Sequence, residues 1–289
     1  VVPKGESYDV KAFRDANSDG WPNNGDPWAH HANDPIEVNA SRSDFHVPLV
    51  DRDSDEDGFL DLHEEQYGSD PYDDNSMPGL DFGLVAHWTF DETDGAVLGD
   101  SSGNDVNGTL NGFDFLTDPH WVPGRVGGAL RFDGVDDYVS FPGATALDNL
   151  YPMTFSGWVK REDDPDGGYI LAKRSTSTGY WRLHSGNDNL TWVRQFVSAD
   201  PDYTGGGPPI LDQWTHLAFT WNGAGTANAS DEATHLYVDG AQVANPTRGN
   251  GVGAPVTDAS NLFTIGNRPD GNTSWFKGSL DDYRLWNRV

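Results

Sequence analysis

The chain has 289 residues, of which 46 are acidic and 18 are basic, so its net charge is −28. Such a charge repels nucleic acid and anionic lipid and excludes partners that are held by phosphate contacts. The absence of cysteine excludes disulfides and thiolate metal sites, and the sequence predicts no membrane insertion because it lacks a long apolar run. Eleven tryptophans, ten tyrosines and fourteen phenylalanines supply a hydrophobic core.

Acidic residues are denser in the N-terminal part of the chain. Residues 1–83 hold 20 acidic and 5 basic residues, whereas residues 84–289 hold 26 and 13. A turn-rich linker runs from Asn75 to Gly79. We therefore predict a metal-binding segment over residues 1–79 and a second domain over residues 80–289. The start of the chain is not a signal peptide, so we expect a processed form or a piece of a longer protein.

The first predicted element is a twelve-residue metal-binding loop from Asp15 to Asp26. An EF-hand loop supplies oxygen ligands at positions 1, 3, 5, 7, 9 and 12. Those positions hold Asp15, Asn17, Asp19, the carbonyl of Trp21, Asn23 and Asp26. Two of these side chains are neutral, so we expect weak binding, and a polar turn that binds nothing is the alternative.

The second predicted loop runs from Asp53 to Glu64 and fits the same pattern more closely. Its ligand positions hold Asp53, Asp55, Asp57, the carbonyl of Phe59, Asp61 and Glu64, with Gly58 at the sharp turn. A short helix that exits the loop is predicted over residues 59–67, with Gly68 as its C-cap. Because no helix enters the loop, we expect Ca²⁺ to stabilise this segment rather than to act as a signal.

Both loops resemble a known calcium-binding repeat. The second loop with its sequel Tyr67-Gly68-Ser69-Asp70-Pro71 resembles the thrombospondin type 3-like repeats of secreted bacterial proteins, and residues 15–22 are similar to the same repeat. The resemblance implies a secreted or cell-surface protein in which neighbouring repeats share ligands. It adds Asp51, Asp70 and Asp73 as candidate ligands.

The second domain consists of strand-like runs with alternating apolar residues. In chain order the predicted strands span residues 84–90, 129–133, 138–141, 153–159 and 169–172, a hairpin over 181–196, and then 214–221, 235–238, 262–265 and 280–286. Asp239 and Gly240 mark a tight turn between two strands. With no helical pattern between the strands, the sequence predicts an all-β sandwich.

Several motifs of this domain resemble laminin G-like domains over residues 84–289. They include Val85-Ala86-His87-Trp88-Thr89-Phe90-Asp91-Glu92, Gly127-Gly128-Ala129-Leu130-Arg131-Phe132-Asp133-Gly134 and the closing Gly278-Ser279-Leu280-Asp281-Asp282-Tyr283-Arg284-Leu285-Trp286. The resemblance implies a concanavalin A-like jelly-roll of two antiparallel sheets, with the first and last strands adjacent. It also implies a further calcium ion, for which Asp133 and Asp282 are candidates. Acidic turn residues that face water are the alternative.

Catalysis is not expected in this domain. Retaining glycosidases need two carboxylates about 5 Å apart, but after Glu92 the only glutamates are Glu162 and Glu232, both in polar segments. A nucleophile elbow of the form Gly-x-Ser-x-Gly is also absent. We therefore predict a non-catalytic module, with a polysaccharide-degrading enzyme as the weaker alternative.

Carbohydrate binding or adhesion is the activity that these motifs favour, because sugars stack on aromatic rings beside polar side chains. In the predicted hairpin, Tyr180, Arg182 and His184 share one face, and Trp192 and Arg194 share a face across the turn. The alternative is that the tryptophans belong to the core. The expected partner is a glycan or a cell-surface or matrix polymer. A second hypothesis is a subunit of an extracellular filament or surface assembly, in which residues 1–15 pair with a neighbouring copy.

Overall fold

The computed structural model describes residues 53–55, 59–116, 119–162, 167–174, 179–186, 189–197, 202–205, 210–223, 234–243, 247–248, 252–259, 261–268 and 274–289, together with four short strands nearer the N-terminus. The chain divides into two compact units, Val1–Phe82 and Gly83–Val289. This division falls close to the linker that the sequence indicates. Among the described residues, no helix has the length and hydropathy of a membrane-spanning segment.

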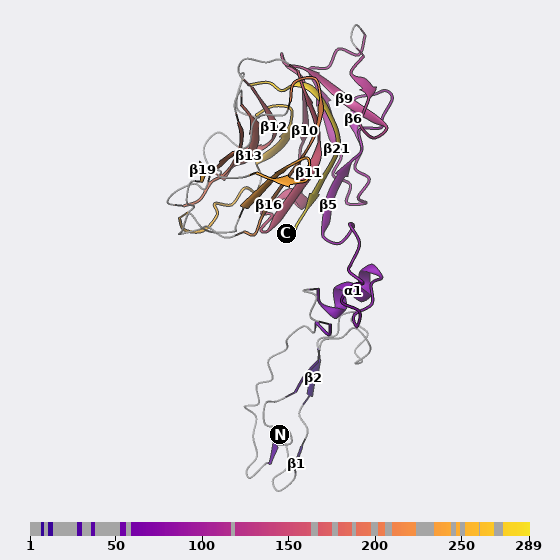
Figure 1. Ribbon diagram of the computed structural model, residues 1–289, viewed down its shortest axis with the longest axis vertical. Helices are drawn as coiled ribbons and strands as arrows, with labels where there is room; N and C mark the ends of the chain where they lie inside the picture. Colours follow the sequence, from indigo (N-terminus) through magenta and orange to yellow (C-terminus); the bar gives the residue numbers. More distant parts are fainter. Residues whose placement is uncertain are drawn as a thin grey trace. The chain divides into compact units, whose positions relative to one another are not determined.

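The N-terminal unit contains two small strand pairs and one helix (Figure 1). Strand β1 (Ser7–Tyr8) pairs with β4 (Ile36–Glu37), and β2 (Lys11–Phe13) pairs with β3 (Trp28–His30), both antiparallel. The segment that was expected to pair with a neighbouring copy thus pairs within its own chain at β1 and β2. A structure of one chain does not test pairing with a neighbouring copy, which stays a prediction.

Helix α1 (Asp61–Tyr67) begins within the second predicted calcium loop and includes the last four residues of that loop. It ends at Gly68, which adopts a left-handed conformation with φ of 80° and donates its N–H to the carbonyl of Glu64. Glycine reaches this conformation without strain, so the predicted C-cap is confirmed. The ring of Phe82 packs edge-on against Phe59 and Tyr67, at centroid distances of 5.5 and 5.1 Å. These aromatic contacts give the acidic unit a small apolar centre.

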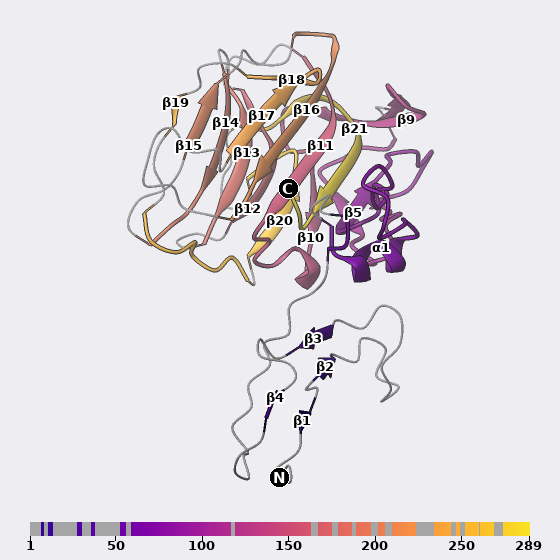
Figure 2. The same ribbon diagram turned by 60° about the horizontal axis from the view of Figure 1, so that its bottom comes forward.

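The second unit is a sandwich of two antiparallel sheets, as the sequence predicted (Figures 1 and 2). In the described residues the first sheet has nine strands, in the spatial order β19 (Thr247–Arg248), β15 (Asp202–Gly205), β14 (Leu190–Arg194), β13 (Trp181–Ser185), β12 (Gly168–Arg174), β20 (Leu262–Ile265), β10 (Tyr138–Phe141), β7 (Gly108–Asn111) and β6 (Val97–Leu98). The second sheet has eight strands. Seven follow one another in the order β18 (Ala241–Gln242), β17 (Thr234–Val238), β16 (Trp214–Trp221), β11 (Met153–Arg161), β21 (Lys277–Trp286), β9 (Gly128–Asp133) and β8 (Trp121–Pro123), and the eighth, β5 (Leu84–Trp88), pairs with β21 off this path.

The pairing of β5 with β21 places the first and last predicted strands side by side, as expected. A single helical turn, η1 (Thr145–Leu147), lies between β10 and β11. Asp239 and Gly240 both have positive φ, 50° and 77°, in the turn between β17 and β18. Such a turn matches the twist of the two strands that it joins, so the predicted hairpin is confirmed.

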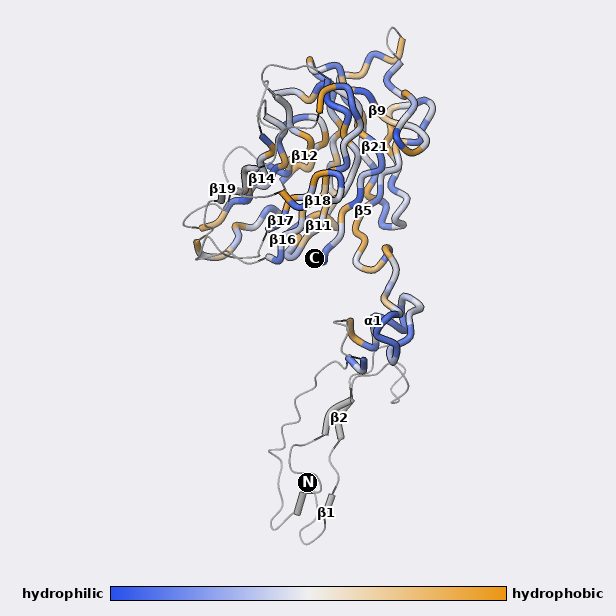
Figure 3. The backbone as a smooth tube through the Cα atoms, viewed as in Figure 1, coloured by the Kyte–Doolittle hydropathy of each residue, from blue (hydrophilic) through white to orange (hydrophobic). Residues whose placement is uncertain are grey.

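The core lies between the two sheets because alternate residues of each strand point inward. Strand β11 and strand β16 both show strict alternation of buried and half-buried positions. Trp88 of the eight-stranded sheet packs on Phe263 of the nine-stranded sheet at 5.7 Å, and Trp192 packs on Phe219 at 5.6 Å. In Figure 3 hydrophobic and hydrophilic stretches are interspersed along the sandwich, whereas the tube around α1 is mainly hydrophilic.

A buried carboxylate ties the final strand to the turn between β8 and β9. Asp281 of β21 is fully buried, and its Oδ2 accepts the backbone N–H groups of Arg125 and Val126 at 2.7 and 2.8 Å. Its Oδ1 is buried and has no hydrogen-bond partner. Burial, which is the largest cause, raises the pKa of Asp281 to about 6, against the lowering effect of the two N–H groups.

Candidate functional site

The outer face of the nine-stranded sheet carries three of the predicted ligand-binding residues. Strand β13 alternates strictly, so Trp181 and Leu183 are buried in the core while Arg182 and His184 are half-exposed on the outer face. Tyr180, two residues before Arg182, is also half-exposed. The structure therefore brings Tyr180, Arg182 and His184 together on one face, as the alternation of the sequence indicated.

A β-bulge adds a tyrosine from the neighbouring strand to this face. The pairing of β12 with β13 shifts register between Tyr169 and Leu171, which pair with His184 and Leu183 respectively. Residues two apart on a regular strand would share a face, but the bulge turns Tyr169 outward while Leu171 remains in the core. Tyr169 then meets the ring of His184 edge-on at a centroid distance of 4.8 Å.

Guanidinium groups lie over the rings of this face. The central carbon of Arg174 is 4.7 Å from the centroid of the Tyr180 ring, and that of Arg182 is 5.7 Å from Tyr180 and 5.9 Å from Tyr169. Arg268 approaches the Tyr169 ring to 5.6 Å, and its Nη1 donates to the Tyr169 hydroxyl at 3.4 Å. We call this set the cationic–aromatic face; it comprises Tyr169, Arg174, Tyr180, Arg182, His184 and Arg268.

The charged side chains of the cationic–aromatic face are arginines, although the chain as a whole is strongly negative. The pKa of His184 falls to about 4, first because the ring is desolvated and then because the charges of Arg182 and Arg161 oppose its protonation. His184 is therefore neutral at physiological pH. Within the described part of the chain, Arg182 makes no ion pair, and the contacts that it makes are to the two tyrosine rings.

The other two predicted ligand-binding residues point into the core, so their assignment is wrong. Trp192 and Arg194 pair in register with Leu183 and Trp181, both inward-facing, and are 1% and 0% exposed. Trp192 packs between aromatic rings of the opposite sheet. Arg194 donates from Nη1 to Oδ2 of the fully buried Asp258 at 2.8 Å. The two residues do share a face, but that face is the interior.

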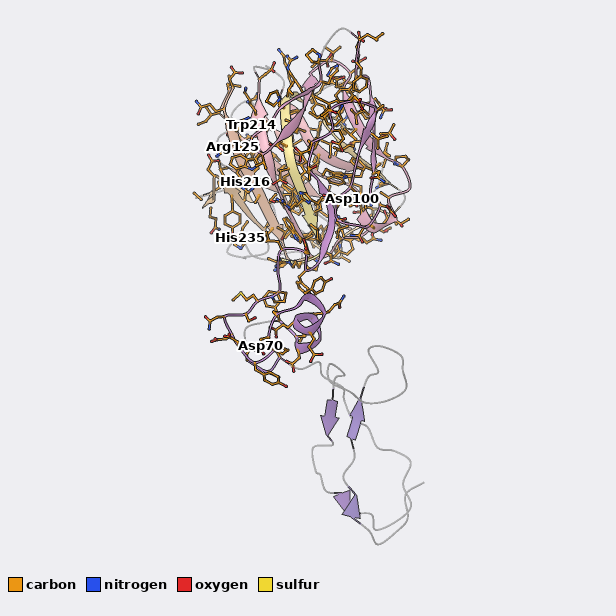
Figure 4. The ribbon with its side chains drawn as sticks, turned by 90° about the vertical axis from the view of Figure 1, so that its right-hand side faces the viewer. Asp70, Asp100, Arg125, Trp214, His216 and His235 are labelled. Carbon is orange, nitrogen blue, oxygen red and sulfur yellow. The ribbon has the colours of Figure 1, made fainter. Side chains whose placement is uncertain are left out.

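The outer face of the eight-stranded sheet is a second aromatic surface. Trp214, His216 and His235 of β16 and β17 follow one another along it (Figure 4). Trp158 of β11 meets the His216 ring at 5.1 Å and lies under the guanidinium of Arg125 at 4.9 Å. Sequence alternation within these strands marks the surface, although it was not among the predicted sites.

Three titratable or charged groups on this second face, His87, Asp282 and Arg284, are paired with one another. Asp282 Oδ1 lies 2.8 Å from Nε2 of His87, and its Oδ2 accepts from Nη1 of Arg284 at 2.7 Å.

The predicted calcium site shared by Asp133 and Asp282 does not form. Asp133 pairs in register with Lys277, five residues before Asp282 on the same strand. At about 3.3 Å per residue, the two carboxylates are roughly 16 Å apart along β21. The prediction of a joint site is therefore wrong, because the closing strand runs past Asp133 before it reaches Asp282.

Asp133 belongs instead to an acidic cluster with Asp136 and Asp137, in which one carboxylate oxygen of each residue lies within 4.8 Å of the others. Asp137 is 1% exposed; its Oδ2 accepts the Asp133 N–H at 2.8 Å, whereas its buried Oδ1 has no hydrogen-bond partner. Burial raises the pKa of Asp137 to about 6, and the neighbouring carboxylates add to the rise. An oxygen-only donor set with a buried, unpartnered carboxylate oxygen fits a hard cation such as Ca²⁺. The spacing of these three aspartates in the sequence is the signal that could have identified the cluster.

The first predicted calcium loop, Asp15 to Asp26, lies outside the described residues, as do Asp51 and Asp57. In the second loop, Asp61 folds back so that its two carboxylate oxygens accept the amide and the hydroxyl of Ser54, each at 2.7 Å. Glu64, at position 12, is fully buried. A buried carboxylate at this position and a loop closed by Asp61 fit the oxygen cage of a calcium site.

The further candidates Asp70 and Asp73 are exposed and take part in local turns. Asp70 Oδ1 accepts the N–H of Tyr72, and Asp73 Oδ1 accepts the N–H of Asn75, both at 3.1 Å. These are side-chain to backbone bonds two residues ahead, which are typical of turns.

Two solved structures with TM-scores above 0.5 agree with the sandwich fold. The receptor binding domain of botulinum neurotoxin mosaic serotype C/D is similar with a TM-score of 0.52 and 15% identity, over 73% of this chain and 48% of that chain. The Trypanosoma rangeli sialidase is similar with a TM-score of 0.51 and 20% identity, over 74% of this chain and 31% of that chain. Domain 4 of AbnA, an extracellular arabinanase from Geobacillus stearothermophilus, has a TM-score of 0.49 and 22% identity, over 70% and 91% of the two chains.

This chain therefore spans about half of the neurotoxin domain and a third of the sialidase. At such identities the similarity concerns the fold alone. No match was found among curated protein sequences. The model of one family matches residues 133–289, which is more than half of the chain and includes the strands of the cationic–aromatic face. The chain thus belongs to the concanavalin A-like lectin/glucanases superfamily.

Proposed function

We propose that the chain is a non-catalytic, extracellular carbohydrate-binding module whose ligand lies on the cationic–aromatic face. The observation that carries this proposal is the half-exposed ring of Tyr180 beside the guanidinium of Arg182. A sugar ring stacks its C–H face on an aromatic ring while its hydroxyls need fixed hydrogen-bond donors, and this face offers both within one pair of strands.

Binding rather than catalysis fits the side chains of this face. The described side chains on the outward positions of β12, β13 and β14 are aromatic, basic, small or neutral, and none is a carboxylate. Glycoside hydrolysis commonly uses a pair of carboxylates that flank the scissile bond. His184, held neutral by its surroundings, is suited to hydrogen bonding with a hydroxyl.

Calcium is the proposed cofactor, and its role is structural. In the second loop the described candidate ligands are Asp53, Asp55, the carbonyl of Phe59, Asp61 and Glu64, in the positions of an EF-hand loop. The cluster around Asp137 is a second candidate within the sandwich. Both would supply stability, because a cation that binds the native state raises its free energy of unfolding. Extracellular Ca²⁺ and the absence of cysteine are compatible with a secreted protein.

A glycan array tests the binding proposal, with the intact chain probed in the presence of Ca²⁺ and again with EDTA. The Tyr180→Ala variant should lose at least tenfold in affinity, since stacking on an aromatic ring depends on that ring. Trp214→Ala, on the outer face of the opposite sheet, is the matched control and should bind as the native chain does. Absence of binding to every glycan, or release of reducing sugar from a bound polysaccharide, contradicts the proposal.

A further inference from the structure

We infer that the glycan recognised by the cationic–aromatic face carries a carboxylate, as a uronic or sialic type of sugar residue does, and that Arg182 holds it. This inference rests on the proposed function and specifies its ligand. It derives from the arrangement of arginines over tyrosine rings and from the absence of a carboxylate partner for Arg182 in the described part of the chain.

The geometry of Arg182 leaves its hydrogen-bonding edge available. Its guanidinium lies 5.7 Å from the ring centroid of Tyr180 and 5.9 Å from that of Tyr169, which are cation–π distances. Such contacts use the attraction between the charge and the ring but leave the N–H groups in the guanidinium plane for other acceptors. A carboxylate accepts two of these parallel N–H bonds, a match that a neutral hydroxyl cannot make.

The rings hold Arg182 in place before a ligand arrives. Tyr169 is only 7% exposed, so it supports the arginine rather than stacking on a sugar. Its hydroxyl accepts a hydrogen bond from Arg268, which restrains the ring. Tyr180 is half-exposed, and the guanidinium groups of Arg174 and Arg182 lie 4.7 and 5.7 Å from its ring centroid. A carboxylated sugar beside the exposed part of this ring therefore lies close to two cations.

The overall charge limits the kind of acidic ligand. A net charge of −28 repels a dense polyanion at long range, whereas the charge of the Arg182 guanidinium acts over the few ångströms of a direct contact. A glycan in which single carboxylated residues are separated by neutral sugars satisfies both conditions. A nucleic acid or a densely sulfated polysaccharide does not.

Matched ligands provide the test. The native chain is probed on an array that presents uronic- and sialic-acid glycans, each beside its methyl ester, together with sulfated glycans and a single-stranded oligonucleotide. The ester preserves the sugar and removes the charge. We expect the acid to bind about ten- to a hundredfold more tightly than its ester, as is typical for charge-assisted hydrogen bonds.

Variants then locate the contact. With the best acidic glycan, Arg182→Gln should lower the affinity to that of the ester, and Arg182→Lys should keep only part of it, because a lysine lacks the planar pair of donors. Lys160→Gln, which removes one positive charge from a half-buried position on the other sheet, is the matched control and should change little. The Arg182→Gln variant should bind the neutral ester with the same affinity as the native chain does. This measurement is the control that the variant is folded.

The outcomes separate this inference from the proposed function. Equal binding of acids and esters overturns the inference while glycan binding stands. Preference for sulfated glycans or for the oligonucleotide also overturns it. Absence of binding to every glycan overturns both the inference and the proposed function.

Discussion

Removal of the Asp258 carboxylate should strongly destabilise the sandwich. Asp258 is fully buried, and its Oδ2 accepts from Arg194 at 2.8 Å while its Oδ1 lies 3.3 Å from Nζ of Lys173. The same Oδ1 also accepts the N–H of Asn149 at 2.7 Å. Arg194 is 0% exposed and Lys173 is 1% exposed, so both cations depend on groups inside the protein for compensation.

The expected decrease in the free energy of unfolding depends on which cation loses its carboxylate partner. Lys173 keeps the carbonyl of Leu147 and the carboxylate of Asp148, whereas Arg194 keeps only neutral partners, chiefly Tyr151. Breaking one side of a buried ion pair costs about 3–5 kcal/mol because a charge remains buried and uncompensated. For a unit of this size each kcal/mol shifts the melting temperature by about 2–4 °C, so a decrease of roughly 6–20 °C is expected.

Thermal and urea unfolding of Asp258→Ala, monitored by tryptophan fluorescence, measure this effect. Asp258→Asn should lose nearly as much, because it removes the charge but hardly changes the volume. Arg194→Met in that background should recover most of the loss by removing the unpaired cation. Glu162→Gln breaks a half-exposed pair with Arg131 and should cost less than about 1 kcal/mol. If Asp258→Ala costs no more than this control, the buried network does not stabilise the fold as described.

Three further outcomes are expected. Calcium should raise the melting temperature of the native chain, and EDTA should reverse the shift. Glu64→Gln should abolish the shift, whereas Glu65→Gln, at an exposed position on the same helix, should leave it unchanged. Calorimetry with and without metal measures these melting temperatures. Asp281 has a pKa near 6 in the folded chain and a usual value of 3.8. Its ionisation therefore lowers the free energy of unfolding as the pH rises from about 4 to 6, and this loss is complete above about pH 6. Asp281→Asn should therefore stabilise the chain at pH 7, by about 3 kcal/mol at most, and flatten the stability profile between pH 4 and 6, as urea unfolding across that range shows. Trp192→Ala should cost about 3–5 kcal/mol through a core cavity, whereas Tyr180→Ala should leave the free energy of unfolding within about 0.5 kcal/mol of the native value.

The strands could be predicted from the sequence because each obeys a period of two. Strands β16 and β20 match the predicted residues, and the pairing of the first and last strands is as expected. Short strands such as β6 and β8, with two and three residues, were not predicted, because so few residues give no measurable alternation. They form because a longer neighbour offers free backbone groups to pair with.

Alternation also shows which residues share a face, but it does not show which face is buried. The face that carries Trp192 and Arg194 can be buried because Asp258, which is 64 residues from Arg194 in the sequence, pairs with the arginine. An arginine in a core is stable only where such a partner is supplied, and no local pattern reveals it. The same limitation explains why the position of Asp282 was not predicted. Its carboxylate contacts His87, on a strand almost 200 residues away in the sequence, and does not approach Asp133.

The bulge in β12 determines what the binding face can do. With regular pairing, Tyr169 and Leu171 would both point inward, and Arg182 would have one tyrosine ring beside it rather than two. The extra residue turns Tyr169 outward, next to His184, and so places a second ring against the guanidinium of Arg182. Since an arginine held by two rings loses less freedom when it binds a ligand, a single irregularity in one strand prepares this face for an acidic sugar.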